Sequence, residues 1–153
     1  MDKINIAKLL NSDLGADLKF ELDESIHNLD LPTEMIGKRV AGKLTVIKLD
    51  GLVLLKGDLL ANAVLICDRC LDNFKAHIPF NLECEYNLNR SRLGEGGLAV
   101  DKFGGIDLTI PLREEIILAL PIKNICGPNC AGICAGCGVN LNKEKCTCKK
   151  ERE

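Results

Sequence analysis

Residues 126–148 read CGPNCAGICAGCGVNLNKEKCTC, which places six cysteines within 23 positions. The spacing is C-x3-C-x3-C-x2-C-x8-C-x-C, and the intervening residues are rich in glycine, asparagine and alanine. A C-x2-C turn lets two thiolates approach one ion from the same side, and two such pairs complete the tetrahedron that zinc prefers. Core packing does not require so many thiols in so short a stretch. The segment therefore predicts a metal site.

Three further cysteines lie upstream. Cys67 and Cys70 form an isolated C-x2-C pair, and Cys84 falls on the apolar face of a predicted strand, where we expect a buried structural thiol. Setting Cys84 aside leaves eight thiols, the number that two four-thiolate structural Zn²⁺ sites need. The predicted metal ligands are Cys67, Cys70, Cys126, Cys130, Cys134, Cys137, Cys146 and Cys148.

Two pairings of these thiols remain open. The first forms two sites from adjacent pairs: Cys134, Cys137, Cys146 and Cys148 in one, and Cys67, Cys70, Cys126 and Cys130 in the other. The second groups them differently: Cys126, Cys130, Cys134 and Cys137 in one site, and Cys67, Cys70, Cys146 and Cys148 in the other. We favour the first because each site uses adjacent pairs. Neither pairing leaves the open coordination position that a catalytic zinc requires.

Other uses of the cysteines are weaker alternatives. Disulfides need an oxidising compartment, yet the first residues, MDKINI, show no apolar stretch of a signal peptide. Nine cysteines also cannot all pair within one chain. An iron–sulfur cluster would use the same thiols, and spacing alone does not exclude it. A redox dithiol at Cys67 or Cys134 lacks the βαβ context of thioredoxin-like proteins. We therefore expect zinc, in a cytoplasmic protein.

Length and composition indicate an ordinary globular protein. At 153 residues with 46% apolar content, the chain is long enough for one domain with a small metal-held appendage. We expect a sheet and helix domain over residues 1–122, with a cysteine-rich metal-binding tail over residues 123–153 packed on it. No apolar run approaches the roughly 18 to 20 residues that span a bilayer, so a membrane partner is not expected.

Charge is distributed unevenly along the chain. Residues 123–153 hold six Lys and Arg against three Glu, a formal +3, which leaves −5 for residues 1–122 of a chain whose total is −2. A divalent ion held by four thiolates adds −2, so an acidic metallated protein argues against a broad phosphate-binding surface. A basic protein partner or a small local RNA contact fits better. The candidate RNA or partner contacts are Lys143, Lys145, Lys149, Lys150 and Arg152.

The centre of the chain reads as an antiparallel β-meander. Residues 40–49 lead into Asp50-Gly51, a dipeptide typical of a type I′ hairpin turn, and residues 52–67 form a second long strand. From Phe74 to Tyr86, apolar residues recur at a strict period of two, which predicts a half-buried strand. Pro79 on its polar side indicates an edge strand or a bulge.

A short strand and a helix are predicted after the meander. Residues 106–110 alternate as a strand, and Pro111 suits the first turn of a helix. Leu112, Ile116 and their neighbours Ile117, Ala119 and Leu120 give that helix an apolar face broad enough to cover the sheet. The predicted class is α+β: an antiparallel β-meander or barrel-like sheet covered by a helix, with a C-terminal cysteine-rich zinc-binding tail.

Several of these segments together resemble the YceD family. They are Cys67-Asp-Arg-Cys70-Leu71, then IDL at 106–108 with EEIILALP at 114–121, then the cysteines of residues 126–148. The resemblance covers roughly residues 40–148, and members are called large ribosomal RNA subunit accumulation proteins. It implies a non-enzymatic bacterial cytosolic factor for synthesis, processing or stability of large-subunit (23S) rRNA in ribosome biogenesis. The implied partners are rRNA or a basic ribosomal protein of the large subunit.

A zinc-thiolate redox sensor or chaperone is the alternative function, because zinc thiolates release their metal on oxidation. Loss of zinc in mild peroxide with a gain of holdase activity would favour it. An enzyme is not expected, because two isolated histidines provide no nucleophile, base and orienting group. We accordingly expect no small-molecule substrate.

Overall fold

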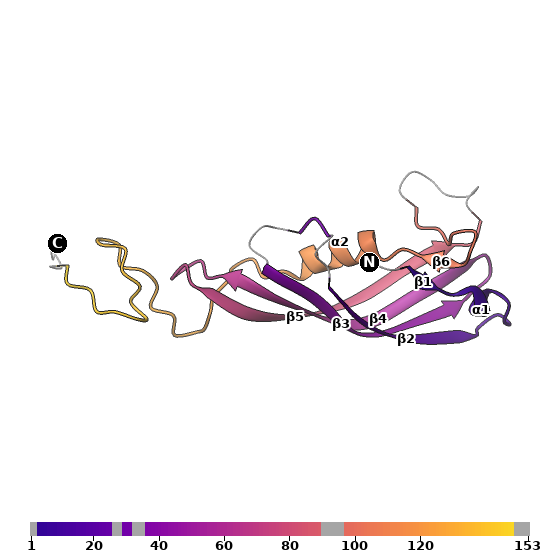
Figure 1. Ribbon diagram of the computed structural model, residues 1–153, viewed down its shortest axis with the longest axis horizontal. Helices are drawn as coiled ribbons and strands as arrows, with labels where there is room; N and C mark the ends of the chain where they lie inside the picture. Colours follow the sequence, from indigo (N-terminus) through magenta and orange to yellow (C-terminus); the bar gives the residue numbers. More distant parts are fainter. Residues whose placement is uncertain (1–2, 26–28, 32–35, 90–96, 149–153) are drawn as a thin grey trace.

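The computed structural model describes residues 3–25, 29–31, 36–89 and 97–148. Four long strands form one antiparallel sheet in the order β2-β3-β4-β5, and a two-stranded pair, β1 with β6, lies at one end of it (Figure 1). The elements are β1 (Ile4–Asn5), α1 (Ala7–Leu10), β2 (Asp17–Ser25), β3 (Ile36–Lys48), β4 (Leu52–Ile66), β5 (Asn73–Asn87), β6 (Gly105–Ile106) and α2 (Thr109–Ala119).

The sheet buries one face because its strands alternate apolar and polar residues, as the period of two predicts. In β4, Val53 and Leu55 are fully buried, whereas Lys56 and Asp58 are exposed. Leu55 lies opposite Cys84 on β5 across an uninterrupted register that runs the length of both strands. The β-meander prediction is therefore confirmed.

The sheet is open, so the barrel-like alternative is wrong. Within the described part of the chain, β2 pairs only with β3, and β5 has only β4 as its partner strand in the sheet. The sheet therefore has two edges, β2 and β5, whereas a closed barrel has none. β5 is an edge strand, as Pro79 indicated, because a residue without an N–H is tolerated at a sheet edge.

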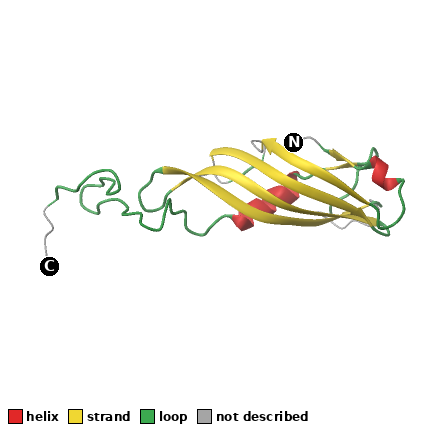
Figure 2. Cartoon of the chain, turned by 90° about the horizontal axis from the view of Figure 1, so that it is seen from below, coloured by secondary structure: helices red, strands yellow, loops and turns green. Residues whose placement is uncertain are grey.

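Helix α2 covers the apolar face of the sheet, and Figure 2 shows it crossing that face. Its residues Leu112 and Ile116 are fully buried on the side that faces the sheet. Ile117 is 37% exposed and so lies outside this buried side of the helix. At the helix start, Asp107 accepts a hydrogen bond from the Thr109 N–H at 2.9 Å. The helix ends two residues before Pro121, where the chain turns toward the cysteines.

Two local predictions differ from the structure. The strand predicted over residues 106–110 is only β6, because β1 offers two residues to pair with and α2 has already begun at Thr109. The hairpin between β3 and β4 is not type I′, which needs positive φ at both central residues. Only Gly51 has one, at +74°, and Asp50 avoids the left-handed region that is costly for a side chain.

No helix among the described residues has the length and apolar character that a membrane crossing requires. The division of the chain at residues 122 and 123 into a sheet domain and a tail stays a prediction. What the structure does place is the cysteine-rich segment, which runs outward from the end of the sheet where β4 turns into β5 (Figure 1).

Candidate metal centres

The turn between β4 and β5 presents the first two thiols. Its backbone closes through the Leu71 N–H to the Cys67 carbonyl and the Cys67 N–H to the Asp72 carbonyl, both at 2.9 Å. Leu71 has a φ of +60°, the left-handed conformation that reverses the chain within one residue. The sulfur-bearing residues Cys67 and Cys70 are buried, 0% and 4% exposed.

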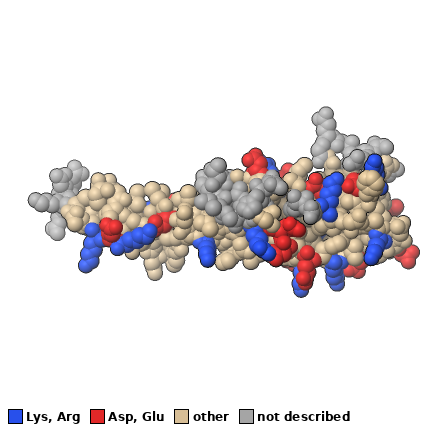
Figure 3. Space-filling model, in the orientation of Figure 1, with Lys and Arg blue, Asp and Glu red and all other residues tan. Residues whose placement is uncertain are grey.

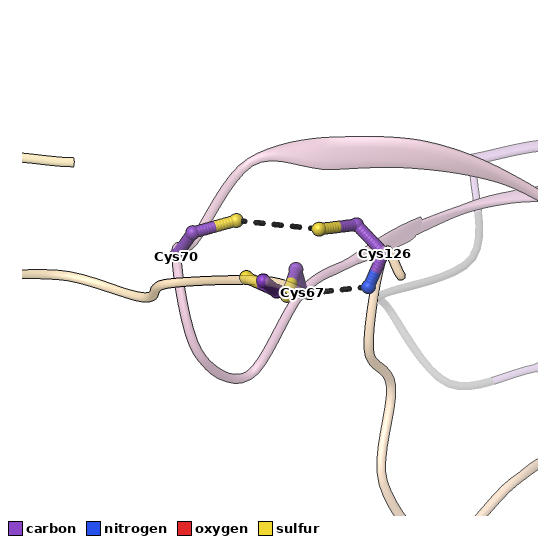
Figure 4. Close-up of side chains that lie close together, drawn as sticks. Cys67, Cys70 and Cys126 are labelled. Atoms are coloured by element: carbon purple, nitrogen blue, oxygen red, sulfur yellow. Dashed lines mark hydrogen bonds between the residues drawn. The ribbon is translucent and has the colours of Figure 1, made fainter. Parts of the chain in front are cut away.

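The segment after α2 is fastened to this turn through Asp68 and Asn124. The Asp68 N–H donates to the Asn124 carbonyl, and the Asn124 N–H donates to the Asp68 carboxylate, both at 2.8 Å. This reciprocal pair places Cys126 beside the turn, where its N–H donates to the Cys67 sulfur at 3.4 Å (Figure 4). Asp68, which follows Cys67, and Asn124, two positions before Cys126, thus bring the two cysteine segments together.

Four sulfur atoms meet at this place, and we call them the proximal quartet: Cys67, Cys70, Cys126 and Cys130. All four lie within 4.8 Å of one another. The Cys70–Cys126 sulfur distance is 3.7 Å and the Cys67–Cys130 distance is 3.9 Å. A tetrahedral zinc with bonds of about 2.3 Å spaces its sulfur ligands about 3.8 Å apart, so the quartet fits one ion of that size.

A second set of sulfur atoms, the distal quartet, lies farther along the tail: Cys134, Cys137, Cys146 and Cys148. The Cys134 N–H donates to Val139 and the Gly138 N–H donates to Cys134, both at 2.8 Å, which folds a compact knuckle. Sulfur distances from Cys146 are 3.2 Å to Cys134 and 3.7 Å to Cys137. This grouping in space is the first of the two pairings weighed from the sequence.

Hydrogen bonds to sulfur lower the pKa of Cys67 and Cys130 in the proximal quartet and of Cys134 in the distal quartet. Burial would raise the pKa of Cys67, but N–H groups of Cys126, Cys70 and Arg69 outweigh it and lower the pKa to about 6. N–H donation from Cys137, contact with Cys146 and donation from Gly136 lower the pKa of Cys134 to about 6. Such donors are the usual surroundings of metal-bound thiolates.

Neighbouring sulfur atoms oppose ionisation of Cys126 in the proximal quartet and of Cys148 in the distal quartet. Cys130 is the main cause that raises the pKa of Cys126 to about 12, and Cys137 does the same for Cys148. Four thiolates at such distances repel one another unless a cation lies among them. The donor set, the spacing and the charge therefore fit a bound divalent ion, and all four tetrahedral positions are filled by protein sulfur.

Cys84 lies apart from both quartets. It lies on β5, half-buried against the core, and burial raises the pKa of its thiol to about 11. Neither described quartet includes it. The structural role expected for this thiol stays a prediction, which metal analysis of a variant can test.

The basic residues expected to contact RNA or a partner have different surroundings. The Lys143 ammonium is held by the Asp72 carboxylate at 2.8 Å, whereas Lys145 is exposed. Lys149, Lys150 and Arg152 lie outside the described residues. Figure 3 shows blue and red side chains interspersed along the visible face, with both colours at the cysteine-rich end.

Sequence reasoning missed three residues that join the two cysteine segments. Arg69 donates to the Cys130 carbonyl at 3.4 Å, and Asn140 donates to Asp72 at 2.7 Å. Asn142 donates to the Cys130 sulfur at 3.4 Å. The only signal in the sequence was the asparagine pair inside the x8 spacing, and asparagine is common in turns for local reasons alone.

The fold and the two quartets define a class of small antiparallel sheet proteins with a cysteine-rich end that could hold two metal ions. Residues 55–153 match the family model described as "Large ribosomal RNA subunit accumulation protein YceD", so the chain belongs to the YceD family. No solved structure matches the chain significantly.

Proteins of plants and mycobacteria are similar to this chain in sequence. The chloroplastic "Large ribosomal RNA subunit accumulation protein YCED homolog 1" of Arabidopsis thaliana is 42% identical over 48 residues, and that of Zea mays is 44% identical over 45 residues. These matches cover 31% and 29% of this chain but only 15% of each plant protein. An uncharacterised protein of Mycobacterium bovis is 30% identical over 136 residues, 82% of this chain and 65% of that protein.

Proposed function

We propose that the protein is a non-enzymatic cytoplasmic factor that supports synthesis, processing or stability of 23S rRNA in ribosome biogenesis. We further propose that two structural zinc ions hold its cysteine-rich end. The supporting observation is the pair of closed sulfur quartets in a chain of a family named for large ribosomal RNA subunit accumulation. Because protein sulfur fills every position of each tetrahedron, neither centre offers a place for a substrate.

Single zinc ions fit the quartets better than iron–sulfur clusters do. A cluster binds its cysteine thiolates to different iron atoms, which separates the thiolates more widely than one shared ion does. Here all four sulfurs of each quartet lie within 4.8 Å of one another. Elemental analysis of the purified chain should find about two zinc ions per protein and no stoichiometric iron.

Charge favours a basic ribosomal protein as the main partner. The chain carries −2 with its thiols neutral. Each divalent ion in four thiolates adds −2, so the loaded protein carries about −6. A surface of that sign attracts basic proteins and repels bare phosphate. Direct RNA contact through Lys143, Lys145, Lys149, Lys150 and Arg152 would then be local, salt-sensitive and poorly sequence-selective.

Deleting the gene and measuring rRNA tests the proposal. The ratio of 23S to 16S rRNA should fall in the deletion strain and recover with the wild-type gene. Neither Cys67→Ser nor Cys134→Ser should restore it fully, whereas Cys84→Ser, which lies outside both quartets, should. An unchanged ratio in the deletion strain, during fast growth and in the cold, would sink the proposal.

Affinity purification of the tagged protein, with and without nuclease, tests the partner. A basic large-subunit protein that remains bound after nuclease treatment supports the protein contact. Loss of all ribosomal material after nuclease would instead support binding through RNA. Charge reversal at the five basic positions should abolish only an RNA-dependent interaction.

A redox sensor or chaperone is a second candidate, favoured by the exposure of the distal quartet. None of the four distal thiols is buried, and Cys137 and Cys148 are exposed. In the proximal quartet Cys67 and Cys70 are buried, and only Cys126 is exposed. Oxidants reach exposed thiolates first. This function predicts loss of one zinc ion in mild peroxide together with a gain of holdase activity. Zinc release without holdase activity would leave only an oxidation-sensitive structural site.

A further inference from the structure

The segments that carry the two quartets contact each other first through their backbones. The Ile133 N–H donates to the Arg69 carbonyl at 3.0 Å, which lays the start of the distal segment on the turn between β4 and β5. A Cβ at Gly132 would lie 3.1 Å from that same carbonyl, so the two backbones are already in close contact. The distal segment therefore rests on the turn that carries half of the proximal quartet.

Asp72 fastens the far side of this contact. Its two carboxylate oxygens accept separate hydrogen bonds, one from the Asn140 amide at 2.7 Å and one from the Lys143 ammonium at 2.8 Å. The Asn140 amide also approaches the Cys70 carbonyl at 3.4 Å. These bonds hold residues 140–143 against the β4–β5 turn, only two residues from the proximal ligand Cys70.

Asn142 reaches a sulfur of the other quartet. Its amide NH₂ donates to the Cys130 sulfur at 3.4 Å, while its amide oxygen accepts from the Ala131 N–H at 2.8 Å. Its backbone N–H is held by the Asn140 side chain at 2.9 Å. A side chain from the distal segment thus stabilises the thiolate form of a proximal ligand, as outer hydrogen bonds do in metal sites.

The position of Asn142 depends on closure of the distal quartet. Asn140, Asn142 and Lys143 all lie in the eight-residue loop between Cys137 and Cys146. Apart from one bridge between Ile133 and Asn140, the described part of this loop has no strand or helix to order it. Fixing each such residue costs about 1 to 2 kcal/mol of entropy. The Asp72 contacts offset part of this cost, and closure of the distal quartet restricts the loop further, so closure should raise the fraction of time that the amide lies at Cys130.

We propose that the two metal centres load cooperatively, with Asn142 as the positioning residue that transmits closure of the distal quartet to the proximal one. The proposal rests on the metal binding proposed above. By thermodynamic linkage, an ion in either quartet strengthens binding in the other by the same factor. We expect that factor to fall within the roughly 5- to 150-fold range typical of coupling between two protein sites.

Zinc titrations against a competing chromophoric chelator measure the coupling in full-length chains. Cys134→Ser with Cys148→Ser leaves only the proximal site, and Cys67→Ser with Cys130→Ser leaves only the distal site. The product of the two association constants of the wild-type chain should exceed the product of the two single-site constants. We expect the excess to be about 5- to 150-fold.

Asn142→Asp tests the positioning role, because it keeps the oxygen that accepts from Ala131 and replaces the NH₂ donor with a carboxylate oxygen. It should weaken proximal binding in the wild-type background and have a much smaller effect where the distal quartet is already disabled. Asn129→Asp is the matched control: it adds the same charge beside Cys130 at an exposed residue outside the interface, and should leave the excess unchanged.

The outcomes separate this inference from the proposed function. If the wild-type chain binds two zinc ions and the two products of association constants are equal, cooperativity is overturned while the structural zinc sites stand. Equal effects of Asn142→Asp in both backgrounds would overturn its positioning role. A wild-type chain that binds no zinc would overturn both the metal sites and their coupling.

Discussion

At the scale of single residues, the surroundings of each sulfur decide how readily the cysteine forms the thiolate that binds a metal. Cys84 and Cys67 are both buried or half-buried thiols, yet the pKa of Cys84 is raised by burial and that of Cys67 is lowered by N–H donors. The difference comes from the backbone around each sulfur: Cys84 lies within a regular strand, whereas Cys67 begins a turn. A strand uses its N–H groups for pairing, and a turn leaves some free to face a sulfur.

Replacement of Cys84 by serine should leave the metal content at two ions per chain. The hydroxyl is more polar than the thiol at a half-buried position, so Cys84→Ser should lower the free energy of unfolding by about 1 kcal/mol. Metal analysis and urea unfolding measure the two effects. Loss of a zinc ion in this variant would show that Cys84 takes part in a centre.

Asp101 should make the stability depend on acid pH. Its carboxylate accepts from the Gly105 N–H at 2.8 Å, from Lys3 at 3.0 Å and from the Phe103 N–H at 2.9 Å, and these contacts lower its pKa to about 2. A carboxyl whose pKa is lower in the folded state stabilises that state above its unfolded pKa of about 3.9. That stabilisation is lost as the pH falls through about 2.

The Asp101→Asn variant should therefore melt below the wild type at pH 7 and approach it near pH 2. Thermal unfolding of both proteins across this range measures the difference. The variant is its own control for other acidic groups, since those are unchanged in it. A melting difference that stays constant from pH 7 to pH 2 would contradict the role assigned to the Asp101 charge.

At the scale of elements, close approach between β3 and β4 depends on glycine. A Cβ at Gly42 would contact the Asp58 carbonyl and lie 2.9 Å from the Leu59 Cα, both backbone atoms of the neighbouring strand. At Gly51, in the hairpin between the same two strands, a Cβ would meet nothing within 4 Å. Both glycines have positive φ, so they differ mainly in the space available.

Gly42→Ala should destabilise the protein more than Gly51→Ala. The hairpin variant meets only the cost of left-handed backbone, about 1 to 2 kcal/mol. The strand variant adds overpacking against backbone that cannot move aside, typically another 1 to 3 kcal/mol. Urea unfolding of both variants tests this order. Equal destabilisation would mean that the two strands can separate without cost at Gly42.

At the scale of the whole molecule, the proximal quartet connects segments far apart in the chain. Its sulfur contacts join residues separated by 56 and 63 positions, one pair from the end of the sheet and one from the segment after α2. The distal quartet closes within a single segment, with contacts over 9 and 12 positions. Loss of metal should therefore have different consequences at the two centres.

Serine variants should separate the centres by metal content and by melting temperature. Cys67→Ser combined with Cys130→Ser should retain one zinc ion, because both residues belong to one quartet, whereas Cys67→Ser combined with Cys148→Ser should retain none. A cross-link that closes a loop of this length contributes about 2 to 4 kcal/mol, so only proximal variants should melt much earlier. If the Cys67 and Cys148 pair instead retains one ion, the second pairing of thiols is correct.

The sequence alone determined the family resemblance, the β-meander, the helix over it and the eight candidate thiols. Each depends on a local signal: a period of two, an apolar helical stripe, or a short cysteine spacing. Such local signals can be recognised in the sequence without knowing which other segments pack against them. They were sufficient to predict two closed quartets, but they left two ways to divide the thiols between them.

Only the tertiary structure brought the eight sulfur atoms together as two groups of four. In the structure α2 crosses the sheet, and the hydrogen bonds between Asp68 and Asn124 then fasten the following segment to the turn that bears Cys67 and Cys70. The open form of the sheet, the pairing of Lys143 with Asp72 and the reach of Asn142 to Cys130 depend in the same way on residues distant in the chain. Spacing limits which neighbouring thiols can share an ion, but contacts between distant segments arise only when the whole chain has packed.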